Sequence, residues 1–483
     1  MPAFWNPGGG KSGRREGRPF EKGGTIVKTE NNLGTDPVGR LVVRLAIPSM
    51  LAQFVSVLYS IVDRMFIGNI PEVGDIALAG VGVAGPIVTL ISAFASLIGI
   101  GGSPLLSIRM GEGDKEKAKR ILANSFLMLL VISVVLTGAA LVLRRPLLLW
   151  FGASETILPY GEEYMTIYVC GTVFALMATG MNQFIISQGF ARVGMFSVLI
   201  GAIANLILDP IFIFGLNMGV RGAALATVLS QVLSCTFVLG FLFSDRPPIR
   251  ITFGNYSIAV MKRILSVGFA PFLIIAFDNI LIITINALLQ KYGGPKEGDM
   301  LVTCATIVQS FMLIVTMPLG GITGGTQAIL GFNYGAGRPE RILLAQKYIL
   351  ALSAAFTAIM FVLARCLPQY FVRLFSDNTE NMELCVWAIR VFTLMIIPLA
   401  FQYTIVDGFT GMGMVKISIS LSFFRKGLFF VFAFALPAFF GARAVFWTEP
   451  LSDGIAGVCS SIIYLTTIKK VLARKAKGMD CAD

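Results

Sequence analysis

Residues 205–210 read Asn205-Leu-Ile-Leu-Asp209-Pro210, which places an amide, a carboxylate and a proline inside an otherwise apolar run. Asn205 and Asp209 lie four residues apart, so on a helix they share one face. Pro210 has no amide hydrogen, so the carbonyl of Leu206 loses its helical partner and becomes a third oxygen near that face. Such groups are tolerated in hydrocarbon where they line a cavity or meet partners. The stretch predicts an ion site inside a membrane.

The whole chain has the composition of a membrane protein. Of its 483 residues, 55% are hydrophobic and 14% are charged, against roughly 25% charged in soluble domains. The apolar runs predict an all-α integral membrane protein with about twelve transmembrane helices of about 20 residues each. The predicted spans are 45–68, 79–101, 121–143, 164–189, 196–214, 220–243, 262–290, 301–330, 341–364, 383–411, 417–440 and 452–472.

The net charge of +12 reports membrane topology rather than a nucleic-acid partner. With a cytoplasmic N-terminus, Lys and Arg gather in the tails and the even-numbered loops, as the positive-inside rule requires. We therefore expect a multi-pass protein of the bacterial inner membrane with both termini in the cytoplasm. Residues 1–40 are basic and Gly-rich and lack the apolar core of a signal peptide, which predicts a disordered cytoplasmic tail.

Composition also excludes several chemistries. The chain has no histidine, which excludes a His proton relay, His metal ligation and His general-base catalysis. The seven cysteines show no spacing typical of a metal knuckle or a redox pair. No Walker A loop is present that would bind ATP. We expect a protein that is not an enzyme and needs no cofactor.

The chain repeats itself at a shift of about 224 residues. Gly111-Glu-Gly113 matches Gly335-Ala-Gly337, and each follows a Gly-rich helix end. Six spans per half is an even number, so both halves enter from the same side and form two six-helix lobes related by a pseudo-twofold axis along the membrane normal. The predicted parts after the tail are the first lobe at 41–243, a cytoplasmic linker at 244–261, the second lobe at 262–472 and a cytoplasmic tail at 473–483.

The polar residues of the first half are not repeated in the second. Asn205 and Asp209 fall opposite Phe424 and Leu428, and Asp63 falls opposite Asn286. The first half alone therefore has a carboxylate pair inside its spans. Because two similar bundles can rock about a shared cavity, the repeat favours a transporter with its substrate between the lobes.

Four polar residues of the first half are predicted to share one layer of the membrane. Asp63, Asp209 and Thr227 lie roughly 7–11 Å below the outer surface, with Asn205 one turn deeper. Their oxygens suit a hard cation such as Na⁺, and two close carboxylates also tend to share a proton. The alternative is that each side chain bonds to a neighbouring helix and only stabilises the packing.

The second half offers candidates for the substrate cavity. Asp278 is predicted at mid-span, where it either faces the cavity and receives a cationic group or makes a local structural bond. The other candidates are polar or adaptable side chains of the spans, namely Asn286, Gln183, Gln309 and Met312. Arg425 and Lys426 are predicted to snorkel at the inner start of span eleven. With Arg425 and Lys426 at the interface, the charged residues predicted inside the membrane are mainly acidic.

The chain resembles the MATE family of multidrug and toxic-compound extrusion transporters over roughly residues 41–470. The matching features are Ile61-Val-Asp63-Arg64-Met-Phe-Ile-Gly68, the Gly-x-Gly loops at Gly111 and Gly335, and Asn205-x-x-x-Asp209-Pro210 with Thr227 on the next helix.

The resemblance implies a V-shaped pair of lobes that exports organic, often cationic, amphiphilic compounds against inward flow of Na⁺ or H⁺. In the DinF-like branch the ion site lies in the first lobe, where Asp63, Asn205, Asp209 and Thr227 match in type and spacing. The Asp63-Arg64 form is similar to the MepA-like subset. In the NorM-like branch carboxylates of spans seven and ten matter as well, and Asp278 and Asp407 do not sit at those positions.

We therefore expect a secondary active antiporter that works by alternating access as a monomer with no obligate protein partner. Its partners would be small organic cations or amphiphilic drugs and the surrounding lipids. The main alternative is a flippase or exporter of lipid-linked precursors, which would be expected to show extra spans or a strongly cationic cavity for phosphate. An intramembrane enzyme would need an Asp-rich metal motif or a His-based site, and a channel would need a filter repeat; the sequence shows none of these.

Overall fold

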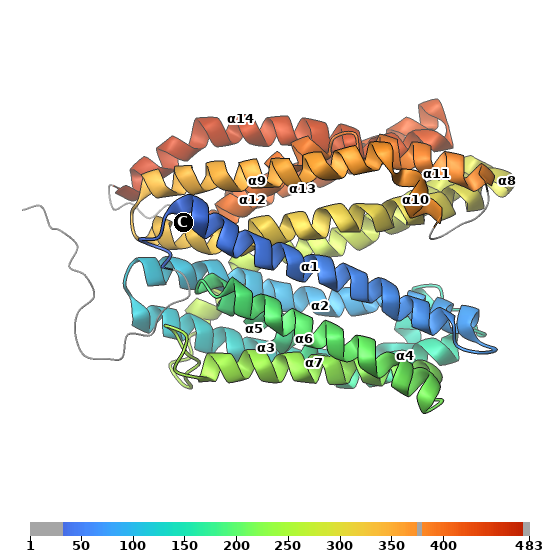
Figure 1. The fold of residues 1–483 in the computed structure, drawn as a ribbon, viewed down its shortest axis with the longest axis horizontal. Helices are drawn as coiled ribbons and strands as arrows, with labels where there is room; N and C mark the ends of the chain where they lie inside the picture. Colours follow the sequence, from blue (N-terminus) through green and yellow to red (C-terminus); the bar gives the residue numbers. More distant parts are fainter. Residues whose placement is uncertain (1–31, 374–378, 477–483) are drawn as a thin grey trace, which may run out of the picture.

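The computed structural model describes residues 32–373 and 379–476, and the secondary structure it gives them is helical (Figure 1). Apolar runs are helical here because a chain in lipid must satisfy its backbone polar groups within each segment. The helices of the first half are α1 (Val38–Gly68), α2 (Gly74–Gly111), α3 (Lys115–Trp150), α4 (Leu158–Cys170), α5 (Thr172–Ser187), α6 (Ala191–Pro210), the π-helical turn η1 (Ile211–Gly215) and α7 (Gly219–Phe243).

The second half begins with the longest helix, α8, which bends at Gly294, a residue with a positive φ of 65°. The bend divides α8 into two candidate spans, Ile258–Gly294 and Met300–Gly335. The helices are α8 (Ile258–Gly335), α9 (Pro339–Cys366), α10 (Pro368–Arg373), α11 (Thr379–Phe392), α12 (Ile396–Gly411), α13 (Val415–Phe440), the 3₁₀ turn η2 (Ala442–Trp447) and α14 (Thr448–Ala476).

The predicted twelve-span, all-α fold is confirmed. Ten helices of the described residues are long and apolar enough to cross a membrane, and two bent helix pairs bring the number to twelve. The pairs are α4 with α5, bent by 57°, and α11 with α12, bent by 46°. These bends were not predicted, and they fall at matching places in the two repeats.

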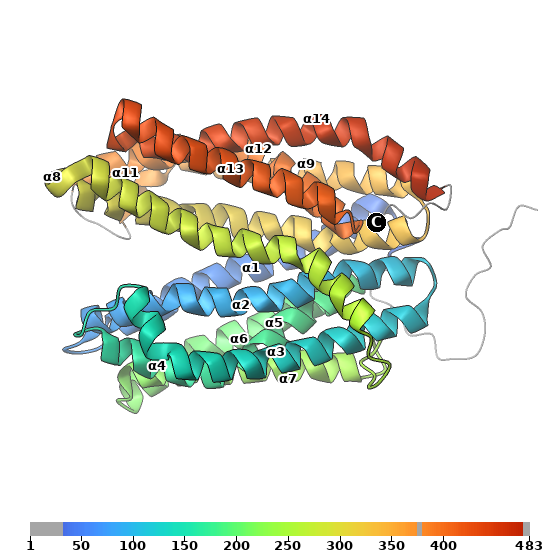
Figure 2. The same ribbon diagram turned by 180° about the vertical axis from the view of Figure 1, so that it is seen from behind.

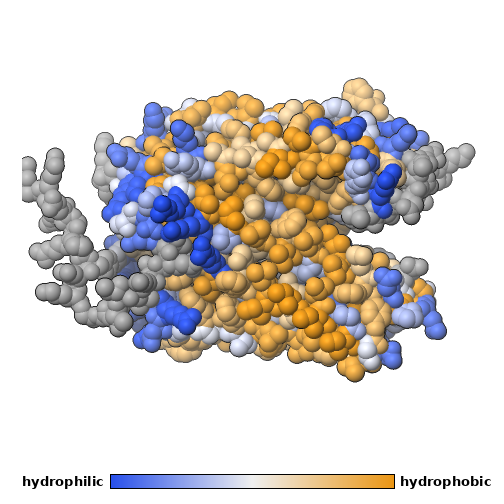
Figure 3. All heavy atoms as spheres, viewed as in Figure 1, coloured by the Kyte–Doolittle hydropathy of each residue, from blue (hydrophilic) through white to orange (hydrophobic). Residues whose placement is uncertain are grey.

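The helices form two bundles, one built from α1–α7 and the other from α8–α14 (Figures 1 and 2). The start of α1 and the end of α14 lie at the same end of the molecule, which we call the terminal end (Figure 1). A hydrophobic band covers the middle of the molecular surface, and hydrophilic residues gather at both ends (Figure 3). This distribution is that of a protein that crosses a bilayer.

The lobes touch closely at the terminal end and separate at the other. At the terminal end the repeated glycines of the two lobes contact the opposite backbone. A Cβ on Gly111 would lie 1.9 Å from the carbonyl oxygen of Phe332, and a Cβ on Gly335 would lie 2.0 Å from the carbonyl oxygen of Ile108. A side chain at either position would force the two backbones apart. At the opposite end a deep cleft opens between the bundles (Figure 3).

Part of the predicted tail is held against the second lobe. Leu33 is buried, and its carbonyl oxygen accepts a hydrogen bond from Asn333 Nδ2 at 3.1 Å. Arg338 and Arg341 donate to the carbonyl oxygens of Gly34 and Asp36. Here the structure differs from the sequence expectation, because backbone carbonyls of residues 33–36 serve as acceptors for arginines that lie some 300 positions later. Residues 1–31 of that tail, and residues 477–483 of the C-terminal one, lie outside the described residues.

Candidate ion site in the first lobe

Three neighbouring helices carry the four predicted ion-site residues. The helix α1 packs against α6, and α6 packs against α7. Asp63 lies five residues before the end of α1, and Asp209 and Asn205 occupy the last two turns of α6. Thr227 lies two turns into α7. All four therefore lie in the half of the first lobe that is closer to the open end of the cleft.

The four side chains form one connected group. Asn205 Nδ2 donates to Asp209 Oδ1 at 3.1 Å and to Thr227 Oγ1 at 3.5 Å. The Thr227 hydroxyl donates to the Ala223 carbonyl oxygen at 3.0 Å. The carboxyl groups of Asp63 and Asp209 lie close enough to interact electrostatically with each other. The spacing of Asn205 and Asp209 thus gives the shared face that was predicted.

Two oxygen atoms of this group need a partner that the described side chains do not supply. Asp63 Oδ1 and Asp209 Oδ2 are buried and have no hydrogen-bond donor among the described residues. A buried carboxylate without a partner is costly, and two that face each other are more so. A proton shared by the two carboxyls, or a cation bound between them, would remove this cost. The residues of the group offer oxygen ligands, which Na⁺ prefers.

Tyrosines of the first lobe complete the surroundings of the group and were not predicted. Tyr164 on α4 lies close to Thr227. Its ring stacks on that of Tyr168, with centroids 6.0 Å apart and planes 13° from parallel. Tyr168 in turn contacts Gln231 on α7. A tyrosine near a helix end is typical of the membrane interface, so sequence position alone does not predict that these two lie inside the lobe.

Pro210 ends the regular part of α6. A five-residue π-helical turn, η1, follows directly, and the Leu216 N–H donates to the Ile211 carbonyl oxygen at 2.8 Å. Proline removes one donor from the helical ladder, and π-helical turns are common beside functional sites. That the Leu206 carbonyl contributes an oxygen to the site stays a prediction.

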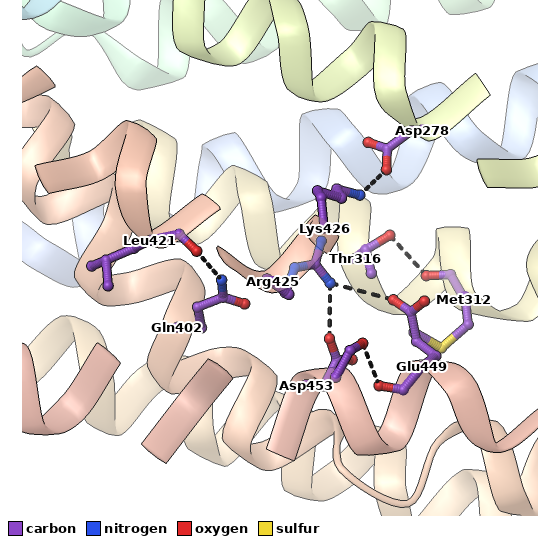
Figure 4. Close-up of polar contacts among 10 residues, drawn as sticks. Asp278, Met312, Thr316, Gln402, Leu421, Arg425, Lys426, Glu449 and Asp453 are labelled. Atoms are coloured by element: carbon purple, nitrogen blue, oxygen red, sulfur yellow. Dashed lines mark hydrogen bonds and ion pairs between the residues drawn. The ribbon is translucent and has the colours of Figure 1, made fainter. Parts of the chain in front are cut away.

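The five predicted cavity residues do not form a single site. Asp278 and Met312 both belong to the second lobe and lie on the two spans of α8 (Figure 4). Gln183 instead lines a small polar gap with Gln327, where α2, α5 and α8 meet. Met312 and Gln327 are separated by about 22 Å of helix. Gln183 therefore belongs to the seam between the lobes.

The remaining two cavity candidates also lie on α8. Asn286 has a buried Oδ1 with no hydrogen-bond partner among the described residues. Gln309 is half-buried in the second span of the helix. Their part in a cavity stays a prediction.

The prediction that Arg425 and Lys426 snorkel to the interface is wrong. Both are buried near the middle of α13, with exposed fractions of 8% and 7%. Arg425 Nη1 lies 2.8 Å from Asp453 Oδ1 and 3.3 Å from Glu449 Oε1, and Lys426 is ion-paired with Asp278 (Figure 4). The basic groups stay inside because carboxylates of α14 and α8 neutralise them there. Asp278 thus has an ion-pair partner in the second lobe, and its part in a substrate cavity stays a prediction.

Asp407 is also bonded inside the second lobe. It lies on α12 and accepts a hydrogen bond from the Thr323 hydroxyl of α8. The second lobe therefore has intramembrane charges of both signs, whereas the first has the acidic pair.

Two six-helix lobes, a cleft between them and an unsatisfied carboxylate pair within the hydrophobic band define a polytopic membrane transporter. The chain belongs to the MatE family, whose model matches residues 48–211 and 275–435. Members of this family are transporters of the multidrug efflux type rather than enzymes.

Relatives and solved structures agree with this assignment. The FAD transporter of Shewanella oneidensis is 26% identical over 388 residues, covering 78% of this chain and 81% of its own. The multidrug export protein MepA of Staphylococcus haemolyticus is 22% identical over 441 residues, covering 90% of this chain and 95% of its own. A MOP superfamily transporter from Pyrococcus furiosus, described by the reverse polarity of its binding pocket, superposes with a TM-score of 0.85 at 25% identity, covering 94% of this chain and 100% of its own.

Proposed function

We propose that the protein is a secondary active antiporter that exports small amphiphilic, mostly cationic compounds in exchange for Na⁺ or H⁺. The observation that carries this proposal is the pair of neighbouring carboxyl groups of Asp63 and Asp209, each with a buried oxygen that lacks a donor among the described residues. Such a pair binds a proton or a cation because its two negative charges repel each other in a medium of low dielectric. The name of the MepA relative, a multidrug export protein, supports the same type of transport.

The exchange follows from alternating access of the two lobes. With the cleft open at the end away from the termini, an external ion reaches Asp63 and Asp209 and neutralises them. The neutral pair no longer holds α1 and α6 in the same arrangement, and α6 bends at Pro210. The cavity then loses its affinity for a cationic compound, which leaves to the outside. We place the protein in the bacterial inner membrane as a monomer, with both termini in the cytoplasm.

Transport by reconstituted protein tests the proposal. Uptake of a fluorescent cationic dye is followed in proteoliposomes with a Na⁺ gradient and a proton gradient imposed separately. We expect one gradient to drive uptake in the wild type and Asp209→Asn to abolish it. Asp245→Asn is the matched control, because Asp245 has a side chain that is 89% exposed and lies in the loop after α7. Coupled transport at the wild-type rate in Asp209→Asn would refute the proposal.

Export of lipid-linked precursors is the alternative, and one feature favours it. Arg425 and Lys426 place positive charge inside the second lobe, which a phosphate group would require. The relative named as an FAD transporter also carries a compound with phosphate groups. If neither gradient moves the dye in folded protein, uptake of labelled lipid-linked substrates becomes the deciding measurement.

A further inference from the structure

The second lobe contains a charged cluster that the proposed ion exchange does not use. Its members are Asp278 on α8, Arg425 and Lys426 on α13, and Glu449 and Asp453 on α14 (Figure 4). Charges inside a membrane protein are rare and costly, and they commonly mark substrate or ion pathways. Five such charged residues on three helices therefore indicate a functional role for the cluster.

The internal repeat relates this cluster to the ion site of the first lobe. The first span of α8, α13 and α14 are the counterparts of α1, α6 and α7, which hold Asp63, Asp209 and Thr227. Arg425 and Lys426 stand between Phe424 and Leu428, the residues that correspond to Asn205 and Asp209. The same place in the fold is thus acidic in the first lobe and includes two cations in the second.

The two cations are held in different ways. Arg425 is fixed by two carboxylates of one helix, Asp453 and Glu449, whose side chains are 1% and 17% exposed. Lys426 is held by Asp278 of another helix, and the Asp278 side chain is 49% exposed. The Arg425 pair is therefore enclosed, whereas the partner of Lys426 is half-exposed.

Asp278 lies on the side of α8 that carries its ion pair with the buried Lys426. Asp278, Ile285 and Leu289 are seven and four residues apart and so lie on one face of α8. Ile285 and Leu289 are buried in the core of that lobe. Asp278 therefore lies on a face of α8 that also packs into the core of the second lobe.

Aromatic rings border the Lys426–Asp278 pair. The Phe277 ring makes edge-to-face contacts with Phe423 and Phe430 of α13, at centroid distances of 5.5 and 6.5 Å. Phe277 directly precedes Asp278, and Phe423 and Phe430 lie within one turn or so of Lys426. Such rings pack well against the apolar part of an amphiphile.

We propose that Lys426 is the anion-binding residue of the substrate cavity and that a carboxylate or phosphate of the transported compound replaces Asp278 as its partner. A buried ammonium must keep a counter-ion, so departure of Asp278 and arrival of the substrate anion are linked. The substrate class then includes amphiphilic zwitterions and organic anions besides cations. This inference rests on the proposed function, because it concerns compounds carried by the same transport cycle.

If the Lys426–Asp278 pair is purely structural, removing its charges should affect transport differently than if the pair is exchangeable. If the pair only joins α8 to α13, removal of either charge weakens transport of every substrate. If Lys426 binds a substrate anion, the two removals act in opposite directions. Lys426→Gln removes the anion site, whereas Asp278→Asn removes the competitor for it.

Two rhodamine dyes that differ by one methyl ester test the proposal. Rhodamine 123 is a cation, and rhodamine 110 is its free acid, which carries a carboxylate. Binding and gradient-driven uptake of each are measured in proteoliposomes of neutral phosphatidylcholine. We expect Lys426→Gln to weaken rhodamine 110 binding about tenfold or more and Asp278→Asn to strengthen it, with rhodamine 123 changed less than about threefold, as expected for one charge-assisted hydrogen bond.

Two further variants control for charge and folding. Lys416→Gln removes an exposed lysine of the same helix and should change neither dye. Lys426→Arg keeps the charge and should retain rhodamine 110 binding. Equal losses for both dyes in Lys426→Gln and in Asp278→Asn would overturn the inference, as would rhodamine 110 binding that does not depend on residue 426. Neither outcome contradicts the proposed antiport, provided that an imposed ion gradient still drives uptake of rhodamine 123.

Discussion

At the scale of single residues, Thr227 contributes the hydroxyl of the first-lobe site. Thr227→Val keeps the shape of the side chain and leaves Asn205 bonded to Asp209 at 3.1 Å. If the hydroxyl oxygen is an ion ligand, its loss should weaken affinity for the coupling ion about tenfold, or about 1.4 kcal/mol. Ion-dependent dye uptake measured over a range of ion concentrations gives the value.

Thr236→Val is the matched control for this substitution. Thr236 lies on the same helix, is exposed, and donates its hydroxyl to the Val232 carbonyl oxygen at 2.8 Å. It should leave the ion dependence unchanged. An equal ion affinity in both variants would exclude the Thr227 hydroxyl from the set of ligands.

Helix spacing correctly predicted the shared face of Asn205 and Asp209, but the predicted position of Arg425 and Lys426 was wrong. Asn205 and Asp209 are four residues apart, so their shared face follows from helix geometry alone. The spacing along the chain does not predict that Arg425 and Lys426 are buried, because their partners are distant in sequence: Asp453 lies 28 residues after Arg425, and Asp278 lies 148 residues before Lys426. Single-sequence reasoning has no access to such pairings.

At the scale of an element, the start of α3 depends on Asp114. Its Oδ1 accepts the Lys117 backbone N–H at 3.0 Å, and its Oδ2 lies 2.8 Å from the Lys117 ammonium. These bonds to Lys117 hold the pKa of Asp114 below its ordinary value. The ionised carboxylate therefore stabilises the fold above the unfolded-state pKa of about 3.9, and the effect is lost as pH falls through the lower folded-state pKa.

Asp114→Asn keeps a capping side chain but removes the charge. We expect its thermal midpoint to lie below that of the wild type at pH 7 and the difference to become smaller at pH 3. High salt should reduce the difference at pH 7 because exposed ion pairs are screened. A difference that is the same at both pH values would contradict the titration of Asp114.

The glycine seam between α2 and α8 is a second element-level feature. Gly335→Ala would place a Cβ 2.0 Å from the Ile108 carbonyl oxygen, so the helices must move apart. We expect a cost of about 1–3 kcal/mol, typical of overpacking, seen as a lower thermal midpoint in detergent. Gly320→Ala lies on the same helix with no atom within 4 Å of its Cβ and should cost nothing. Equal thermal midpoints for the two variants would contradict a close backbone contact between α2 and α8 at Gly335.

The sequence predicted the number of spans but not their bends. The span 164–189 is interrupted at Gly171, where a Cβ would lie 2.5 Å from Val228 of α7. The span 383–411 is interrupted between α11 and α12, after Phe392. Hydropathy reports the length of an apolar run but not where a neighbouring helix approaches its backbone. Neither bend can therefore be predicted from composition.

At the scale of the whole molecule, two features of the fold determine how it can move. The lobes touch backbone to backbone at the terminal end, at Gly111 and Gly335, and they are separated by a cleft at the other end (Figure 3). Each lobe has its own hydrophobic core. Packed cores resist deformation, so the expected change is a rotation of one lobe against the other.

Such a rotation predicts a change in distance across the cleft. Trp150 at the end of α3 and Phe440 at the end of α13 are 81% and 77% exposed and belong to different lobes. Spin labels at these positions, in a chain freed of native cysteines, report the separation at the open end. A rotation of about 15° moves the end of a lobe about 40 Å long by about 10 Å. We expect the distance distribution to shift toward shorter values when a transported dye or the coupling ion favours the state closed at this end.

A label pair within the first lobe separates this motion from a general loosening of the helices. Trp150 and Leu216 lie at the same end of one lobe, and Leu216 is 60% exposed. Their distance should stay constant under every condition. Because a ligand moves an equilibrium only by its difference in affinity for the two states, Asp209→Asn should abolish the response to the coupling ion while leaving the response to dye. A response to the ion in that variant as large as in the wild type would place the coupling outside the first-lobe carboxylate pair.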